Sequence, residues 1–507
     1  MACFNLAAIF TDHMVLQRNK NINIWGNAYN DTIITVEFNG NKVTAATDEG
    51  SWKAVLPPME AGGPYELKVT DNSGGEIVLH DVMIGEVWLA GGQSNMELEL
   101  QNSLNGKEVL ANIKDVNVRF YYTQKIPYID DYFHFVERNN CWTIASPDTA
   151  ACYSAVGYYY AKMLSEKLGV TVGVIGCNWG GTSASAWMSR ELLEKDVDTK
   201  TYVDEYDAAM EGKTFEQYCK ERKEFFEWEK EWQPKIGEFY AKNPEGTWDE
   251  AQAYAGPSCW PEPMGPKSPL RPAGVYETML KRVCPYTVAG FIYYQGESDD
   301  HKPTTYYKLL KLLIEQWRTD WEDDSLAFML VQLPMFLNRG EENHKRWCYI
   351  REAQMRVHET TKNTGIAVIL DKGEYGNIHP VDKQPVGERL ALQALYHIYG
   401  EIPANEAYGP VYKSCDYVDG GMLVSFDYAW DGIELCGEKP IGFEIAGADK
   451  KYVEADAEIR GDKIFVKSDK VANPVYLRYN WTNYGDVTLF GRNGIPVAPF
   501  RTSRNDE

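Results

Sequence analysis

Short runs of alternating apolar and polar residues occupy about the first 80 positions of the chain. Three of them are INIWG from residue 22, TIITVEFNG from residue 32 and YELKVT from residue 65, and Gly, Asn, Asp and Pro residues separate such runs. Alternation with a period of two places every second side chain on one face of a strand, and the separating residues favour turns. The pattern predicts a small antiparallel β-sandwich over residues 1–82.

From about residue 83, continuous apolar runs alternate with stretches that have a helical period. The strand-like runs include VMIGEVWLA, VTVGVIGC, YTVAGFIYYQ, LAFMLVQLP and GIAVILD, and helix-like stretches such as TTYYKLLKLLIEQWRTDW stand between them. This alternation predicts an α/β domain over residues 83–404, in which helices cover both faces of a parallel sheet. Ligands of such sheets bind beyond the carboxyl ends of the strands.

Two further segments depart from this alternation. Residues from about 192 to 272 are charged and rich in tryptophan with helical spacing, which predicts a helical insertion with a solvated charged face. The loop that ends it, GPSCWPEPMGPKSPLRPAG, is a candidate rim of a binding site. Short strand-like runs such as GMLVSFDYA return from residue 405 and predict a second β-rich domain over residues 405–507.

Composition limits the partners of the protein. The 507 residues are 44% hydrophobic and 25% charged, without an apolar run of about 18 residues, so we expect a soluble globular protein with no membrane span. A net charge of −23 and the lack of a dense Lys or Arg block argue against nucleic acid as a partner. The 15 tryptophans and 33 tyrosines permit stacking on sugars, although aromatic side chains more often build a core.

Neither the cysteines nor short motifs indicate a metal or an organic cofactor. The ten cysteines lack CxxC spacing, and HExxH and GxxxxGK are absent. The start of the chain has no basic segment and too short an apolar run for a secretory signal. A native start at Met1 therefore predicts a cytoplasmic protein, and a trimmed signal would make it secreted or periplasmic. The oligomeric state is not predicted.

Ser94 is the first candidate catalytic residue. It follows the strand EVWLA through Gly91 and Gly92, which permit a sharp turn, and a helix-like stretch follows it. Backbone N–H groups at a helix N-terminus favour developing negative charge, as a nucleophile beside an oxyanion hole requires. A helix cap is the alternative interpretation. The neighbours Gln93 and Asn95 are candidates for oxyanion or substrate contacts.

A nucleophilic serine needs a base, and the chain has eight histidines. Six of them fall in helical patterns, in a charged loop or in the β-rich segments, and only His301 and His379 lie near strand ends. His379 is the stronger candidate, because it lies in a loop between the buried strand GIAVILD and a helix, beside the rigid Pro380.

Two more strand ends carry groups that would complete such a site. The run AGFIYYQGESDD ends a strand with Gln295, Glu297 and Asp299, and a carboxylate there can orient a protonated imidazole. A solvated or helix-capping acid is the alternative. In GVIGCNWGGTSASAW the amides of Gly180 and Gly181 are candidate oxyanion donors, and an ordinary turn is the alternative. Four strand-end motifs with complementary roles favour a serine hydrolase.

With these motifs together, the chain resembles the SGNH hydrolase superfamily, and within it the sialate O-acetylesterase group and related acetylxylan esterases. The blocks GEVWLAGGQSNME, YYQGESD, REAQ, IHPVDKQPVGERLA and LFGRNGIPVAPFRT carry the resemblance, which covers nearly the whole chain. It implies a flavodoxin-like three-layer α/β/α domain flanked by small all-β domains. It also implies a carbohydrate O-acetylesterase that acts on an acetylated carbohydrate.

The resemblance further implies that Ser94 is the nucleophile and His379 the general base, with oxyanion donors from Ser94 N–H and from Gly180 or Gly181. The base takes the serine proton as the hydroxyl attacks the acetyl carbonyl, and water then cleaves the acetyl-enzyme. Many relatives carry an acid two residues before the histidine. This chain has Asn377 there, and an amide cannot stabilise an imidazolium by charge.

The acid must therefore come from another position. Glu297 is the expected acid, with Asp371 and Glu374 as alternatives. The asparagine of the superfamily's third block is also absent from QGESDD, and Gln295 or Ser298 is the expected replacement donor.

Two other classes of protein remain open. A glycoside hydrolase would use Glu297 with a second carboxylate such as Asp299, and a glycan-binding protein would use the aromatic side chains without catalysis. The substrate is also open between acetylated sialic acid and an acetylated plant polysaccharide. A sialic acid carboxylate calls for a cation, and the candidates are Arg271, Arg318 and Arg351.

Overall fold

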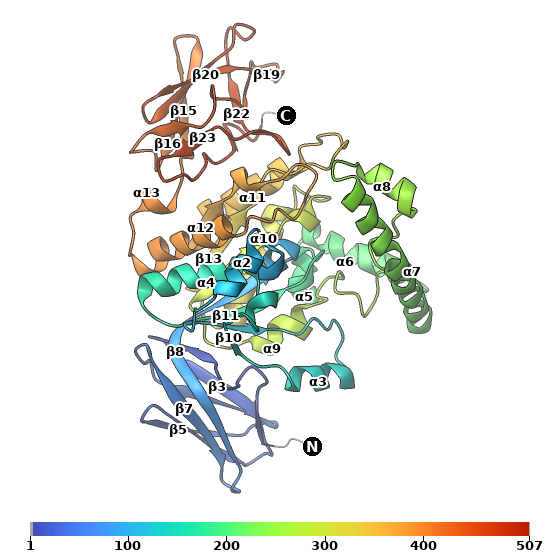
Figure 1. The fold of residues 1–507 in the computed structure, drawn as a ribbon, viewed down its shortest axis with the longest axis vertical. Coiled ribbons are helices and arrows are strands. Elements are labelled where there is room, and N and C mark those ends of the chain that lie inside the picture. Colours follow the sequence, from blue (N-terminus) through green and yellow to red (C-terminus); the bar gives the residue numbers. More distant parts are fainter. Residues whose placement is uncertain (1–3, 506–507) are drawn as a thin grey trace.

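The strand β8 (Glu76–Gly92) connects the N-terminal sheets to the central sheet (Figure 1). In the computed structural model, which describes residues 4–505, the first part of β8 pairs antiparallel with β7 (Gly62–Asp71). Its last part pairs in parallel with β11 (Val172–Asn178) on one side and β12 (Gly290–Tyr294) on the other. The predicted domain boundary after residue 82 lies inside this continuous strand.

The central sheet has the strand order β10, β9, β11, β8, β12, β13, β14. Its further members are β9 (Val118–Tyr122), β10 (Thr143–Ile144), β13 (Ala327–Gln332) and β14 (Thr364–Val368). The six strands from β9 to β14 in this order pair in parallel, whereas β10 and β7 pair antiparallel. Every residue of β11 to β14 is buried, which explains their continuous apolar runs.

Four long helices accompany this sheet, namely α4 (Ala155–Leu168), α10 (Tyr306–Asp320), α11 (Arg346–Thr360) and α12 (Gln384–Ala394). The Ser154 hydroxyl caps α4 by accepting the Gly157 N–H, and Gly169 ends the helix in the left-handed conformation. The predicted α/β class is confirmed. The expected parallel sheet forms the six-stranded centre, and antiparallel strands at its margins make the whole sheet mixed.

The N-terminal segment forms two small sheets that share a core with the central sheet. One contains β1 (Asn5–Leu6), β3 (Ile22–Asn27) and β6 (Ser51–Leu56), and the other joins β4 (Ile33–Phe38) and β5 (Asn41–Ala46) to β7. The short β2 (Val15–Gln17) pairs in parallel with β8. Burial alternates strictly along β6, as its sequence pattern predicts.

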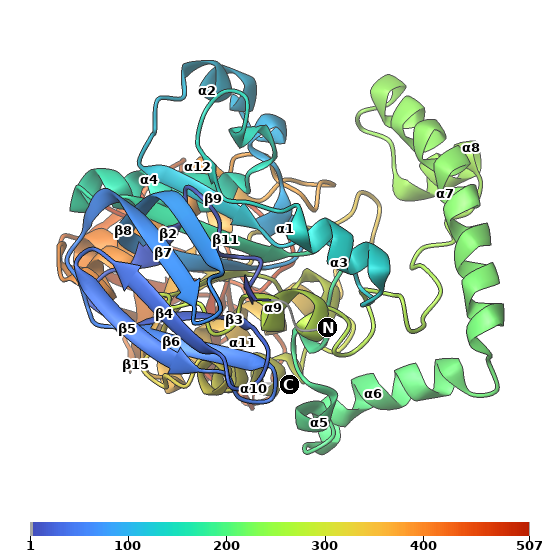
Figure 2. The same ribbon diagram turned by 90° about the horizontal axis from the view of Figure 1, so that it is seen from below.

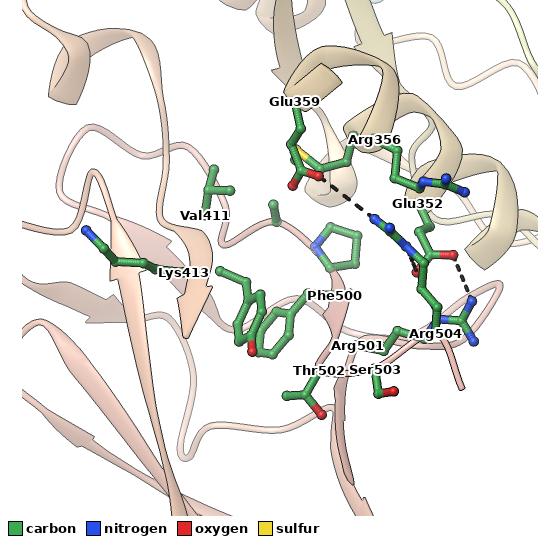
Figure 3. Close-up of a pocket in the computed structure, with 14 residues that line it drawn as sticks. Glu352, Arg356, Glu359, Val411, Lys413, Phe500, Arg501, Thr502, Ser503 and Arg504 are labelled. Carbon is green, nitrogen blue, oxygen red and sulfur yellow. Dashed lines mark hydrogen bonds and ion pairs between the residues drawn. The ribbon is translucent and has the colours of Figure 1, made fainter. Parts of the chain in front are cut away.

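The C-terminal strands form small sheets with a hydrophobic core of their own, at the opposite end of the molecule from the N-terminal sheets (Figure 1). They are β15 (Val411–Val418), β16 (Gly421–Asp427), β17 (Ile433–Leu435), β18 (Phe443–Ala446), β19 (Val453–Glu454), β20 (Asp456–Arg460), β21 (Lys463–Lys467), β22 (Tyr476–Tyr479), β23 (Leu489–Gly491) and β24 (Phe500–Arg501). A pocket of about 430 Å³ lies where β24 meets α11 (Figure 3).

Residues 197–255 form an arm of three helices beside the body of the protein (Figure 2). These are α6 (Val197–Met210), α7 (Phe215–Lys242) and α8 (Trp248–Ala255), and capping boxes begin α7 and α8. The shorter helices are α1 (Ser94–Glu97), α2 (Gly106–Asn112), α3 (Asp131–Arg138), α5 (Arg190–Leu193), α9 (Lys281–Val283) and α13 (Ala404–Ala407). Within residues 4–505, no helix is long and apolar enough to cross a membrane.

Candidate active site

Ser94 is the first residue of α1, directly after β8. Glycine is required in the turn before it, because a β-carbon on Gly92, which has φ 136°, would lie 2.1 Å from Tyr294 O. The N-cap of α1 is Gln93 and not Ser94, and the Ser94 side chain forms no cap bond. Ser94 Oγ instead lies 2.9 Å from His379 Nε2. The structure therefore brings the predicted nucleophile and base together and does not support the helix-cap interpretation.

His379 lies in the loop between β14 and α12, and one side of the residue is open to solvent. Asn377 holds its backbone from both sides: its Oδ1 accepts the His379 N–H at 3.0 Å, and its Nδ2 donates to His379 O at 3.1 Å. Loss of hydration on the packed side, followed by the positive charge of Lys383, lowers the pKa of His379 from its usual 6.5. A lowered pKa keeps the imidazole neutral at pH 7, as a general base must be.

None of the three expected acids hydrogen-bonds to His379 within residues 4–505. Glu297 is buried, and its Oε1 accepts a 2.6 Å bond from Asn95 Nδ2. Asp371 forms an ion pair with Arg389, and Glu374 accepts from Asn377 Nδ2 and Val381 N. The expectation that Glu297 touches the base is corrected here, because its Oε1 accepts from Asn95 and its Oε2 has no hydrogen-bond partner among the described residues.

A buried network of polar side chains connects the loops that carry Ser94 and His379. Lys383 Nζ donates to Asn95 Oδ1 at 2.5 Å, and Asn95 Nδ2 donates both to Glu297 and, at 2.9 Å, to Ile378 O. Asn95, the residue after the nucleophile, is thus bound to Ile378, the residue before the base. Burial lowers the pKa of Lys383 to about 7 and raises that of Glu297. Lys383 was not among the residues predicted from the sequence, although it lies within the block IHPVDKQPVGERLA.

The predicted oxyanion donors differ in their availability. Gly180 lies against the nucleophile, because a β-carbon on it would be 3.3 Å from Ser94 Cβ, but its N–H donates to Glu97 Oε2 at 2.6 Å. Glu97 also forms an ion pair with Lys125. In the described part of the chain, the N–H groups of Ser94 and Gly181 have no hydrogen-bond partner. Of the two expected glycine donors, Gly180 is engaged by Glu97, and Gly181 is the one whose N–H is available beside that of Ser94.

The glutamines near the nucleophile serve a second network. Gln295 Nε2 donates to Gln93 Oε1 at 3.1 Å and to Asp299 Oδ2 at 2.6 Å, and the Ser298 N–H donates to the same Gln93 oxygen. Asp299 also accepts from Tyr202 OH at 2.7 Å. These contacts tie the ends of β8 and β12 together, so the Gln295 side chain and the Ser298 N–H are not free donors. The acids Glu297 and Asp299 likewise do not form an open carboxylate pair.

The three arginines considered for a substrate carboxylate are structural. Arg271 donates to Pro266 O and Pro272 O, Arg318 to Leu326 O and to two further carbonyl groups, and Arg351 to Thr482 O. Among residues 4–505 there is also no cluster of His, Cys, Asp and Glu that could hold a metal ion.

The chain is similar to known carbohydrate esterases in both sequence and structure. The family model described as carbohydrate esterase, sialic acid-specific acetylesterase, matches residues 264–393, which include Glu297 and His379. The crystal structure of a carbohydrate acetylesterase from Xanthomonas citri is 30% identical, covers 99% of both chains and superposes with a TM-score of 0.78. The chain belongs to the carbohydrate acetylesterase family.

Curated relatives of this esterase include the sialate O-acetylesterases of Mus musculus and Homo sapiens. They are 26% and 25% identical and align with 98% of the chain, and the alignments cover 94% and 92% of their own lengths. The predicted class of enzyme, a carboxylic ester hydrolase that removes O-acetyl groups from carbohydrates, is thereby confirmed.

Proposed function

We propose that this esterase hydrolyses carbohydrate O-acetyl esters through an acetyl-serine intermediate, with Ser94 as nucleophile and His379 as general base. The 2.9 Å contact between Ser94 Oγ and His379 Nε2 carries the proposal. A hydroxyl paired with a neutral imidazole at a sheet's carboxyl edge is the arrangement that serine acyl transfer requires.

The reaction runs in two steps. His379 Nε2 takes the Ser94 proton as Oγ attacks the acetyl carbon, and the protonated imidazole then gives that proton to the sugar oxygen as its bond to the acetyl carbon breaks, so the sugar leaves as an alcohol. Water next loses a proton to His379 and attacks the acetyl-serine, which releases acetate and returns the proton to Oγ. The free N–H groups of Ser94 and Gly181 are the proposed donors to the tetrahedral oxyanion.

Charge near the base comes from groups that do not touch it. Asn377 binds the backbone of His379 on both sides. It occupies the position at which many relatives carry an acid, but it supplies no negative charge to the imidazole. Glu97 acts on the imidazole through its field, because its negative charge favours the protonated form. We therefore propose a Ser–His pair held by Asn377 and the Lys383–Asn95 network, with Glu297 supporting it through Asn95.

The topology supports the finer assignment of the fold. Without β9 and β10 the parallel strands follow the spatial order second, first, third, fourth, fifth, which is the flavodoxin-like order. Ser94 follows the first of them, β8, where the order reverses. We infer that the central domain is a three-layer α/β/α domain of the SGNH type.

The first candidate substrate is an O-acetylated sialic acid, as the curated relatives suggest. An acetylated neutral polysaccharide fragment is the second candidate. The observation that favours it is the engagement of Arg271, Arg318 and Arg351 with backbone carbonyl groups, because a sialic acid carboxylate would require a free cation.

Labelling with a serine-directed fluorophosphonate tests the mechanism. We expect one label on the peptide that contains Ser94 and a parallel loss of acetate release. The exposed Ser73 of the N-terminal sheets offers a matched control, since Ser73→Ala should label as the wild type does. Full inactivation with the label on another residue, or continued acetate release by fully labelled enzyme, would overturn the proposal.

A further inference from the structure

Trp260 is an exposed aromatic side chain directly beside the oxyanion turn. It lies in the loop after α8, and 54% of its surface is accessible to solvent. A β-carbon on Gly181 would be 3.1 Å from Trp260 Cζ2 and 3.6 Å from Cη2, so the six-membered part of the indole covers this glycine. An exposed indole at this position presents a flat apolar face to a ligand bound at the turn.

The ring is close to the reacting group. Gly180, the neighbour of Gly181 in the chain, contacts Ser94, since a β-carbon on Gly180 would be 3.3 Å from Ser94 Cβ. The Cα atoms of Gly180, which contacts Ser94, and Gly181, which contacts Trp260, are consecutive and therefore only about 3.8 Å apart. The indole therefore lies within reach of a substrate whose acetyl group is at Ser94.

The helical arm holds the tryptophan in place. The Phe225 ring of α7 lies 6.3 Å from the Trp260 ring between centroids, and Phe225 itself is buried. Trp232 of α7 donates to Gly256 O at 2.8 Å, which fixes the start of the loop. The backbone N–H of Trp260 donates to Ser258 Oγ at 3.2 Å, which fixes the main chain at this residue. A rigid aromatic side chain binds at a low cost in conformational entropy.

We propose that Trp260 forms a sugar-binding subsite in which the indole stacks on the apolar face of the pyranose ring next to the acetylated unit. The esterase then prefers acetylated oligosaccharides to acetylated monosaccharides. The proposal rests on the proposed function for the position of the ester at Ser94. It assigns to the arm and its loop the role of presenting an aromatic platform, which fits pyranose rings because their C–H faces are apolar.

The test compares Trp260→Ala, Trp260→Phe and the control Trp430→Ala. Trp430 is also exposed, at 64%, but belongs to the C-terminal sheets. The substrates are 4-nitrophenyl acetate, which carries no sugar, and acetylated mono- and oligosaccharides of the xylose and sialic acid series. We expect Trp260→Ala to lower kcat/KM about tenfold on the best oligosaccharide, mainly through KM, and to lower it clearly less on 4-nitrophenyl acetate. Trp260→Phe should keep part of the preference, and Trp430→Ala should keep all of it.

Three results would overturn the subsite: equal losses on 4-nitrophenyl acetate and the oligosaccharide, no loss on either, or a wild-type preference for monosaccharides. Failure of the proposed function is a separate result, because it shows as Ser94→Ala enzyme that still releases acetate. The tryptophan variants can still be compared with the wild type in that case, because their substrate preference is measured independently of the identity of the nucleophile.

Discussion

At the scale of single residues, burial and then the charge of Lys383 lower the pKa of His379 and so extend the pH range in which it can act as a base. Activity requires the neutral imidazole, so kcat/KM falls as the pH drops through the pKa of His379, which lies below its usual 6.5. Lys383, with a pKa of about 7, is protonated in that range and opposes protonation of His379. We predict that Lys383→Met moves the acid limb of the kcat/KM profile to higher pH.

The matched control for this change is Lys372→Met. Lys372 lies near the same loop but pairs with Asp382 at 3.1 Å, and its charge is not among those that shift the pKa of His379. Its profile should coincide with that of the wild type. An acid limb that stays in place in Lys383→Met, or that moves equally in both variants, would contradict the role of the Lys383 charge.

The sequence predicted the pair of Ser94 and His379 because parallel strands bring their carboxyl ends to one edge, whatever the detailed packing. It did not predict the partners of Glu297, Gly180 or Gln295. Those partners depend on side-chain rotamers and on the register of neighbouring strands, and a polar side chain at a strand end has several acceptors within reach. Asn95 illustrates the point, since it was expected at the substrate and is buried beneath the nucleophile.

At the scale of elements, α4 and α12 cross at Gly387, and this close approach supports the loop of His379. A β-carbon on Gly387 would lie 2.7 Å from Tyr159 Cβ and 2.7 Å from Val156 O. We predict that Gly387→Ala lowers the free energy of unfolding by about 1–3 kcal/mol, because the helices must separate. Urea unfolding followed by circular dichroism measures the change.

Gly237, in the interior of the exposed helix α7, is the matched control. No atom lies within 4 Å of a β-carbon placed on it, so Gly237→Ala gains helix propensity without a clash. It should be neutral or more stable by up to about 1 kcal/mol. Equal stability of the two variants would show that the crossing of α4 and α12 tolerates a methyl group.

The helices and strands of the central domain could be predicted because their apolar periods are long and regular. The continuity of β8 could not be predicted from the same pattern. The runs EIVLH and VMIGEVWLA look like two strands, since His80 and Asp81 interrupt the alternation, but Asp81 takes φ 53° and the strand continues. A local backbone irregularity of this kind leaves no clear signature in the hydrophobic pattern.

At the scale of the whole molecule, a shielded ion pair fastens the C-terminal sheets to the hydrolase domain. Glu352 of α11 accepts two 2.8 Å bonds from Arg501 of β24 at the pocket drawn in Figure 3, and the side chains are 18% and 6% exposed. We predict that Glu352→Met destabilises the C-terminal sheets by about 2–3 kcal/mol, because the shielded Arg501 loses its two charge-assisted bonds to Glu352.

The double variant Glu352→Met with Arg501→Met separates this effect from packing. Removal of both charges should restore most of the lost stability, since two apolar side chains can replace a shielded ion pair. Trp481, whose ring lies 4.7 Å from the Arg501 guanidinium, reports the unfolding of this region by fluorescence. A double variant less stable than Glu352→Met would contradict the account.

The arrangement of the domains around the site could be predicted only in part. The order of β-rich, α/β and β-rich segments follows from the patterns along the chain. The loop after the helical arm was a candidate rim of the site, but its contact with Gly181 in particular does not follow from the patterns, because it joins segments about 80 residues apart that share no sheet. Their placement comes from the three-dimensional packing of aromatic side chains such as Phe225 and Trp260.

The central claim is that Ser94 attacks the acetyl ester, and acetate release by Ser94→Ala tests it most directly. Wild type and variant are compared on O-acetylated sialic acid and on acetylated xylo-oligosaccharides, with matched melting temperatures as proof of folding. We predict a loss of at least about a thousandfold in kcat on every substrate that the wild type deacetylates. Release within about tenfold of the wild-type rate would contradict the claim, because an enzyme that needs this hydroxyl cannot keep its activity without it.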